Sequence, residues 1–145
     1  MNISKNKKSM AVSIVIVLAM TLTMLLASSA KSFATSDTGF HFRVLPRQEN
    51  GQEVTGRRRG DVSPSNQWWV KLTHSGEGKG ALTDFWLEAK DGTNVSSSMR
   101  VRCGAGWYGK GAYASASNRK VFLTAEDNNY KVTGYTVSGR WQQQD

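Results

Sequence analysis

Alternation of apolar and polar residues with a period of two constrains the fold of this 145-residue chain more than any other feature. In the run GFHFRVLP (39–46), Phe40 and Phe42 share one face, while His41 and Arg43 share the other. Such alternation indicates a half-buried β-strand. The same pattern recurs at 66–74, 81–90, 96–103, 119–127 and 131–141, and more weakly at 112–117.

Turn-forming residues separate these runs and support an all-β fold. Asp91-Gly92 is typical of a two-residue hairpin, and the glycine-rich segment HSGEGKGALTDF (74–85) reads as a second hairpin connection. The polar stretch 48–66 is expected to be an exposed loop. No amphipathic helix pattern follows residue 34. We therefore predict a small antiparallel β-sandwich of about six to seven strands.

The first 34 residues have the three-part layout of a secretory signal peptide. Three lysines precede an apolar run at 10–27, and the small residues that follow end in Ser32-Phe33-Ala34. The alternative is an uncleaved membrane anchor, because the apolar run approaches the ~20 residues that span a bilayer. The cleavage pattern favours secretion, with residues 35–145 as a single extracellular domain.

Cleavage would also change the charge of the chain. It removes four of the 19 lysine and arginine residues and none of the 11 acidic ones, so the net charge falls from +8 to +4. A mildly basic protein is attracted to anionic surfaces such as cell-wall polymers or membrane lipids. The charge is below that of a dedicated nucleic-acid binder, so no nucleic-acid partner is expected.

The patterns that carry enzyme chemistry are weak in this sequence. The glycine-rich segment 74–85 lacks the spacing and the hydroxyl residue of a phosphate-binding loop, so neither a nucleotide nor another cofactor is expected. His41 and His74 are the only histidines, and no metal-ligand spacing or nucleophile elbow is present. We predict a protein that is not an enzyme, with no catalytic residues and no metal site.

Cys103 is the only cysteine, so an intrachain disulfide is impossible. Cys103 and His74 are the residue types of a catalytic cysteine–histidine dyad. Alternation places Cys103 on the apolar side of its strand, however, which favours a packed thiol. The other interpretation is a disulfide that links two copies into a homodimer.

Aromatic residues give the clearest binding signal. Trp68 and Trp69 are adjacent, so they must face opposite sides of one strand. Trp86 lies on the same polar face as charged neighbours. Such a tryptophan could stack on a sugar, or it could be covered by a second layer of the protein. Trp107 and Tyr108 lie between glycines, where they could contact a membrane interface or a wall glycan, or close over the core edge.

Arg57, Arg58 and Arg59 could dock anionic polymers or lipid phosphates, and the alternative is a solvated basic loop. Arg59 also begins the tripeptide Arg-Gly-Asp, a short match that arises often by chance. The predicted binding residues are therefore Trp69, Trp86, Trp107, Tyr108, Arg57, Arg58 and Arg59.

Three segments resemble an uncharacterised family of small secreted proteins of Gram-positive bacteria: VKLTHSGEGKGALTDFWLEAKDGTNVS, GKGAYASASNRKVFLTAEDNNY and YTVSGRW. That family is similar in plan to lactococcin-type β-sandwich bacteriocins, although this chain is longer. The resemblance implies a secreted non-enzymatic protein that acts at the bacterial cell envelope as a bacteriocin-like antimicrobial. The alternatives are a carbohydrate-binding or adhesion module and a self-associating matrix protein. The family defines no catalytic residues that could be carried over.

Overall fold

The structure, a computed structural model, describes residues 37–60 and 65–144, which belong to one compact unit. The predicted signal peptide at 1–34 lies outside the described residues. Within them, no helix has the length and apolar character needed to cross a bilayer.

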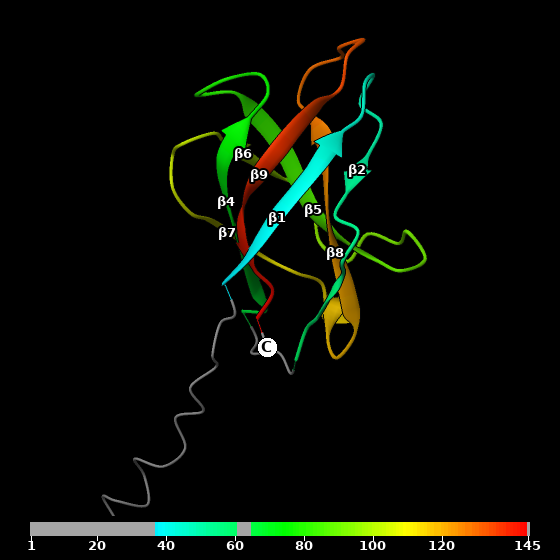
Figure 1. Cartoon of the computed structure of the whole chain (residues 1–145). Coiled ribbons are helices and arrows are strands. Elements are labelled where there is room, and N and C mark those ends of the chain that lie inside the picture. Colours follow the sequence, from blue (N-terminus) through cyan, green and yellow to red (C-terminus); the bar gives the residue numbers. More distant parts are fainter. Residues whose placement is uncertain (1–36, 61–64, 145) are drawn as a thin grey trace, which may run out of the picture. The chain divides into compact units, whose positions relative to one another are not determined.

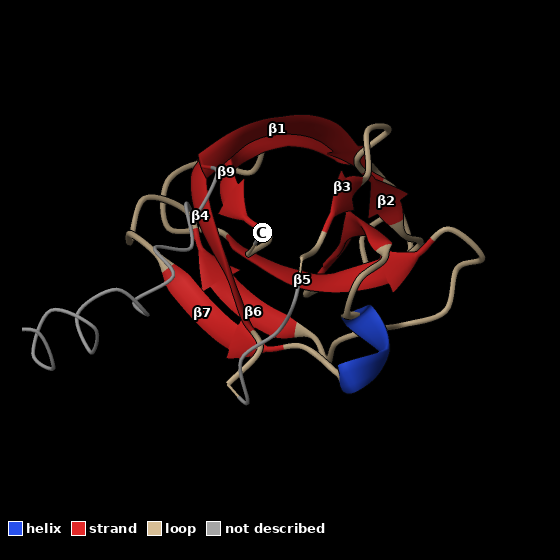
Figure 2. Ribbon diagram, turned by 90° about the horizontal axis from the view of Figure 1, so that it is seen from below, coloured by secondary structure: helices blue, strands red, loops and turns tan. Residues whose placement is uncertain are grey.

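Two antiparallel sheets pack against each other, as predicted (Figure 1). The four-stranded sheet has the order β1 (Asp37–Val44), β9 (Tyr135–Gln142), β4 (Gln67–Ser75), β7 (Tyr108–Gly111). The five-stranded sheet has the order β2 (Gly51–Gln52), β8 (Lys120–Asp127), β5 (Leu82–Ala89), β6 (Met99–Arg102), and β3 (Arg57–Arg58) also pairs with β8. A short 3₁₀ turn, η1 (Ala114–Ala116), precedes β8. The sheets approach each other where β1 meets β2 and where β7 meets β6 (Figure 2).

The core lies between the two sheets and consists of the inward residues that alternation identified. Three phenylalanines form its centre, with ring centroids 5.6 Å apart for Phe40 and Phe42 and 5.7 Å for Phe40 and Phe85. Trp68 and Trp141 are fully buried beside them. Aromatic side chains of this size supply much of the apolar area that a small domain buries.

The segment 74–85 is not a hairpin, because β4 and β5 belong to different sheets. Two successive turns carry the chain across: Gly78 N donates to Ser75 O at 2.9 Å, and Ala81 N donates to Gly78 O at 3.3 Å. Gly78 has φ +100°, a conformation that favours glycine. The sheets of a sandwich lie ~10 Å apart, and this connection spans that gap. The turn predicted at Asp91-Gly92 lies between β5 and β6, which pair antiparallel, but the connection runs over residues 90–98 and is longer than the two-residue hairpin that was predicted.

Three other predictions about loops and strands differ from the structure. The segment 112–117, predicted as a weak strand, contains η1 instead, and the glycine-flanked segment with Trp107 and Tyr108 contains strand β7. Glycines at alternate positions made that strand hard to predict, because a residue such as Gly109 has no side chain and adds nothing to the alternation of apolar and polar residues. The polar stretch 48–66 contains β2 and β3, and both Arg59 and Asn66 are buried.

Candidate functional site

The outer face of the four-stranded sheet carries a group of cationic side chains. Lys71 on β4 is paired with Arg140 on β9, and residues directly opposite in such a ladder have Cβ atoms ~5 Å apart. Arg43 on β1 is exposed on the same face. Asp37 is the one acidic residue facing outward from the described strands of this sheet, and its carboxylate lies 2.8 Å from Arg140 Nε. The face is therefore net positive.

Two half-exposed tryptophans adjoin these cations. Trp69 lies two residues before Lys71 on β4 and is 36% exposed, while Trp68 is buried on the opposite side, as alternation predicted. The Trp69 ring lies over Gly109 of β7, where a Cβ atom would come within 2.5 Å of it. Trp107 is 38% exposed. Trp107 directly precedes β7, whose first residue, Tyr108, pairs with Val70, the residue before Lys71.

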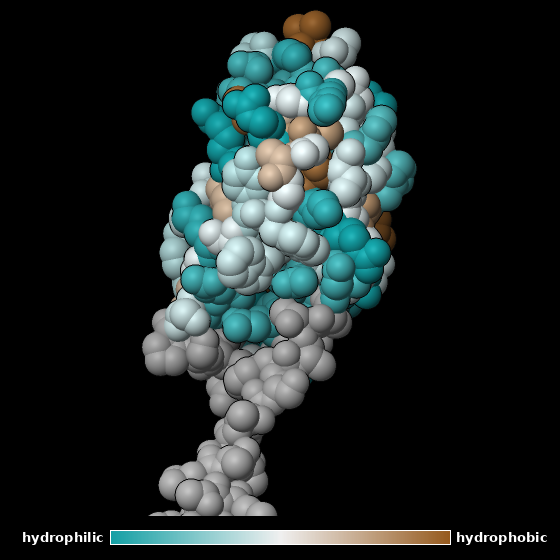
Figure 3. Space-filling model, turned by 90° about the vertical axis from the view of Figure 1, so that its left-hand side faces the viewer, coloured by the Kyte–Doolittle hydropathy of each residue, from teal (hydrophilic) through white to brown (hydrophobic). Residues whose placement is uncertain are grey.

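We call this surface the basic aromatic face and define it by Arg43, Trp69, Lys71, Trp107 and Arg140. The side of the molecule that carries β4 and β7 is mostly hydrophilic, with only small hydrophobic areas (Figure 3). Guanidinium and ammonium groups bind phosphate and carboxylate oxygens, and indole rings stack on sugar rings. The combination suits a polymer that has both anionic groups and sugars.

The seven predicted binding residues do not form one surface. Trp69 and Trp107 belong to the basic aromatic face, whereas Tyr108 is half-buried and packs against the core. Trp86 is 6% exposed on the outer side of the five-stranded sheet, so only a small part of its ring is accessible there. Sequence reasoning missed Lys71, because only the strand register brings it beside Arg140.

The arginine triplet divides between the surface and the interior. Arg58 is exposed, and Arg57 is half-buried with Nη2 3.5 Å from Glu53 Oε1. Arg59 is fully buried, which removes it from the candidate surface, and Asp61 of the Arg-Gly-Asp tripeptide lies outside the described residues.

Arg59 joins segments that are distant in the sequence. Its guanidinium donates hydrogen bonds to the backbone oxygen of Gln143 and the side-chain oxygen of Asn66. The Asn66 amide in turn donates to the backbone oxygens of Ala112, at 3.2 Å, and Tyr113, at 2.9 Å. Burial lowers the pKa of Arg59 to about 10, so the group still carries its charge at neutral pH. This arginine has a structural role.

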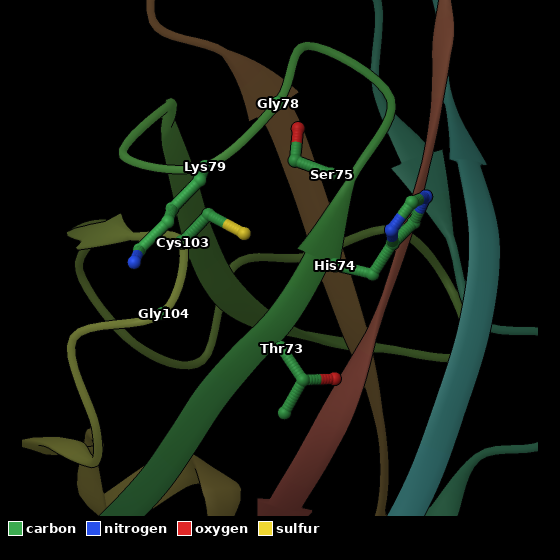
Figure 4. A pocket seen from close by; sticks show the side chains of 7 residues that line it. All are labelled: Thr73, His74, Ser75, Gly78, Lys79, Cys103 and Gly104. Atoms are coloured by element: carbon green, nitrogen blue, oxygen red, sulfur yellow. The ribbon is translucent and has the colours of Figure 1, made fainter.

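Cys103 lies in the connection after β6 and is buried, as alternation predicted. Its backbone N–H donates to Ala81 O at 2.9 Å, and its carbonyl accepts from Gly80 N at 3.1 Å. A cavity of about 340 Å³ adjoins it, lined also by His74, Ser75 and Lys79. Figure 4 shows the His74 ring extending away from the Cys103 sulfur. The geometry does not assemble a cysteine–histidine dyad, and a disulfide between two copies would require this connection to open.

Two acidic side chains face each other on the outer side of the five-stranded sheet. Asp84 and Glu126 are paired in the β5–β8 ladder. Burial, and then the charge of Asp84, raise the pKa of Glu126. The ionised form of Glu126 therefore destabilises the folded protein. The folded protein is favoured most below the pKa of this carboxyl in the unfolded chain, about 4.3. Part of that stability is lost as the pH rises through the higher pKa of the carboxyl in the folded state.

We expect Glu126→Gln to stabilise the protein at pH 7.5 by less than about 1 kcal/mol, because the site is partly solvated. The gain should disappear near pH 4, where the wild-type carboxyl is protonated. Urea unfolding at both pH values measures the effect. Glu49→Gln, at an exposed position, is the control and should change little at either pH. A gain from Glu126→Gln that is equal at both pH values would contradict the assignment.

Comparison with known proteins gives a family but no characterised relative. No curated protein matches the chain. One protein family matches residues 27–145, which include every described strand of both sheets. Because this match covers most of the sequence, the chain belongs to the family described as Protein of unknown function (DUF2712).

Proposed function

We propose that this chain is a secreted, non-enzymatic protein that binds anionic polymers of the bacterial cell envelope through its basic aromatic face. The observation that carries the proposal is the position of half-exposed Trp69 on the same outward face as Lys71, Arg140 and Arg43. The resemblance to small secreted Gram-positive proteins favours a bacteriocin-like antimicrobial as the biological form of this activity.

The geometry of a sheet suits an extended, repeating ligand. Neighbouring strands lie ~4.8 Å apart, and outward residues on one strand repeat every ~6.6 Å. Lys71 and Arg140 are directly opposite each other, whereas Arg43 is opposite Thr136, four residues from Arg140 along β9. An anionic chain would therefore have to cross the sheet diagonally to contact all three. Trp69 and Trp107 would add stacking against sugar units of the same chain. Cell-wall polymers with phosphate groups supply both anionic groups and sugar units, whereas an anionic membrane surface supplies only the anionic groups.

Charge reversal at Lys71 tests the proposal. We expect Lys71→Glu to weaken binding of the 35–145 protein to isolated Gram-positive cell walls by about tenfold or more, because it places a repulsive charge at the centre of the face. Trp69→Ala should weaken binding about fivefold by removing stacking. Cosedimentation with walls, at several protein concentrations, gives the dissociation constants.

Arg58→Glu is the matched control, because it changes the net charge by the same amount at an exposed position on the other sheet. It should have little effect on wall binding. Equal losses from Lys71→Glu and Arg58→Glu would mean that net charge alone drives association. No loss from Lys71→Glu would contradict the proposed face.

Growth inhibition separates the antimicrobial form of the proposal from simple binding. Purified protein that binds walls should also slow the growth of related Gram-positive strains, and Lys71→Glu should reduce that effect in parallel with binding. Binding without inhibition would leave a wall-binding or adhesion module and contradict the bacteriocin-like form.

A further inference from the structure

A second cavity, of about 330 Å³, lies on the outer side of the five-stranded sheet, away from the basic aromatic face. Trp86 of β5 and Glu126 of β8 line it from the sheet. Asn50 before β2, Tyr113 before η1, and Asn94 in the β5–β6 connection line it from the loops. The volume is near the lower end of the range for small-molecule sites, so the ligand would be small.

Trp86 is held in a fixed position in this cavity. Its Nε1 donates to Glu88 Oε1 at 2.8 Å, so the polar atom of the indole is already satisfied by the protein. Glu88 is also buried and accepts further hydrogen bonds from Gln52 Nε2, at 2.7 Å, and Asn50 Nδ2, at 3.4 Å. The small accessible part of the ring therefore gives the cavity a rigid apolar patch. Rigid surfaces bind with little loss of side-chain entropy.

Tyr113 supplies a second aromatic side chain on an anchored backbone. Its N–H donates to Val95 O at 2.8 Å, and its carbonyl accepts from Asn66 Nδ2 at 2.9 Å. The side chain is nonetheless 48% exposed. A tyrosine that is exposed on a fixed backbone at the rim of a cavity is well placed to contact a ligand.

The remaining lining is polar and carries no cation. Asn94, Ser97 and Ser98 supply amide and hydroxyl groups, and Glu126 supplies a carboxylate. Two cations on the neighbouring strands β6 and β7 already have partners: Arg100 binds both carboxylate oxygens of Asp84, at 2.9 and 2.8 Å, and Lys110 Nζ donates to the backbone oxygen of the lining residue Ser98 at 2.6 Å.

This chemistry favours a neutral ligand with many hydroxyl groups. Sugar hydroxyls donate to carboxylate and amide oxygens and accept from amide and hydroxyl groups, while the C–H face of a sugar ring packs on aromatic rings. The carboxylate of Glu126 would repel an anionic ligand. We propose that this cavity binds one neutral sugar residue, with Trp86 and Tyr113 as its apolar contacts and Asn94, the serines and Glu126 as its polar ones.

The direct test is NMR titration of the 35–145 protein with glucose, galactose and N-acetylglucosamine, with the Trp86 indole N–H resonance assigned through Trp86→Phe. We expect at least one of these sugars to shift that resonance with a millimolar dissociation constant, as is usual for a single small polar ligand. Glucuronate should not bind. If none of the neutral sugars shifts the resonance at concentrations up to about 100 mM, or if cationic glucosamine binds more tightly than all of them, the proposal is wrong.

Tyr113→Ala should weaken sugar binding about fivefold, since stacking contacts are worth ~1 kcal/mol. Tyr130→Ala removes another exposed tyrosine, at a position outside the cavity lining, and should leave binding unchanged. Equal effects from the two variants would contradict the role of the cavity. Lys71→Glu should also leave sugar binding unchanged, so failure of this inference and failure of the proposed wall-binding face can be told apart.

Discussion

Replacing Arg59 by methionine should lower the free energy of unfolding by about 2–4 kcal/mol, because it removes the donors of several buried hydrogen bonds at once. The side-chain oxygen of Asn66 and the backbone oxygen of Gln143 both accept from the guanidinium, and both residues are buried. Methionine fills a similar volume but donates no hydrogen bond. Because small domains have only 5–15 kcal/mol of stability in total, much of the protein would be close to unfolding.

Arg58→Met provides the control for this prediction. Arg58 is the neighbouring residue and is exposed, so the same chemical change should alter stability by less than about 0.5 kcal/mol. Urea unfolding of the three proteins, followed by tryptophan fluorescence, measures the difference. Equal stability of Arg59→Met and Arg58→Met would show that the buried network contributes nothing.

Gly139→Ala should destabilise the protein by about 3 kcal/mol or more, the upper range for an overpacked core. A Cβ atom at this position of β9 would lie 2.0 Å from the backbone oxygen of Lys71 and 2.8 Å from the Phe40 ring. The register of β4 against β9 shifts between Leu72 and His74, directly beside the pairing of Leu72 with Gly139. Relief would require the central strands of the four-stranded sheet to separate.

Gly39→Ala is the matched comparison on the adjacent strand. The nearest atom to a Cβ at Gly39 is 3.9 Å away, so the methyl group fits without displacement. We expect Gly39→Ala to fold with a stability within about 1 kcal/mol of the wild type, and thermal unfolding by circular dichroism can compare the two. A stable Gly139→Ala protein would mean that β4 and β9 are not packed as the structure describes.

The alternating pattern predicted most of the long strands, because each one turns a row of apolar side chains toward the opposite sheet. Phe40, Phe42 and Trp68 all point inward as that pattern requires. The pattern could not tell which strands pair. The segment 74–85 looked like a hairpin locally, but β4 pairs with β7 and β9, whose residues come more than 30 positions later in the chain.

The candidate site was harder to predict, because it depends on which groups meet after folding. A run of three arginines suggests an exposed basic loop, yet Arg59 is buried. It donates hydrogen bonds to Asn66 and Gln143, and no sequence pattern predicts that these residues meet it. Trp86 stands on an outward position but is enclosed by loops. Lys71 and Arg140 are outward polar residues of separate strands, and only the register between β4 and β9 places them opposite each other.

The chemical identity of the wall component offers the most direct test of the proposed function. Binding of the 35–145 protein should be measured by cosedimentation with Gram-positive cell walls before and after the phosphate-containing polymers are extracted from them. The basic aromatic face predicts strong binding to intact walls and a loss of about tenfold or more after extraction, because the anionic groups that pair with Lys71, Arg43 and Arg140 are gone. Undiminished binding to the extracted walls would contradict the central claim.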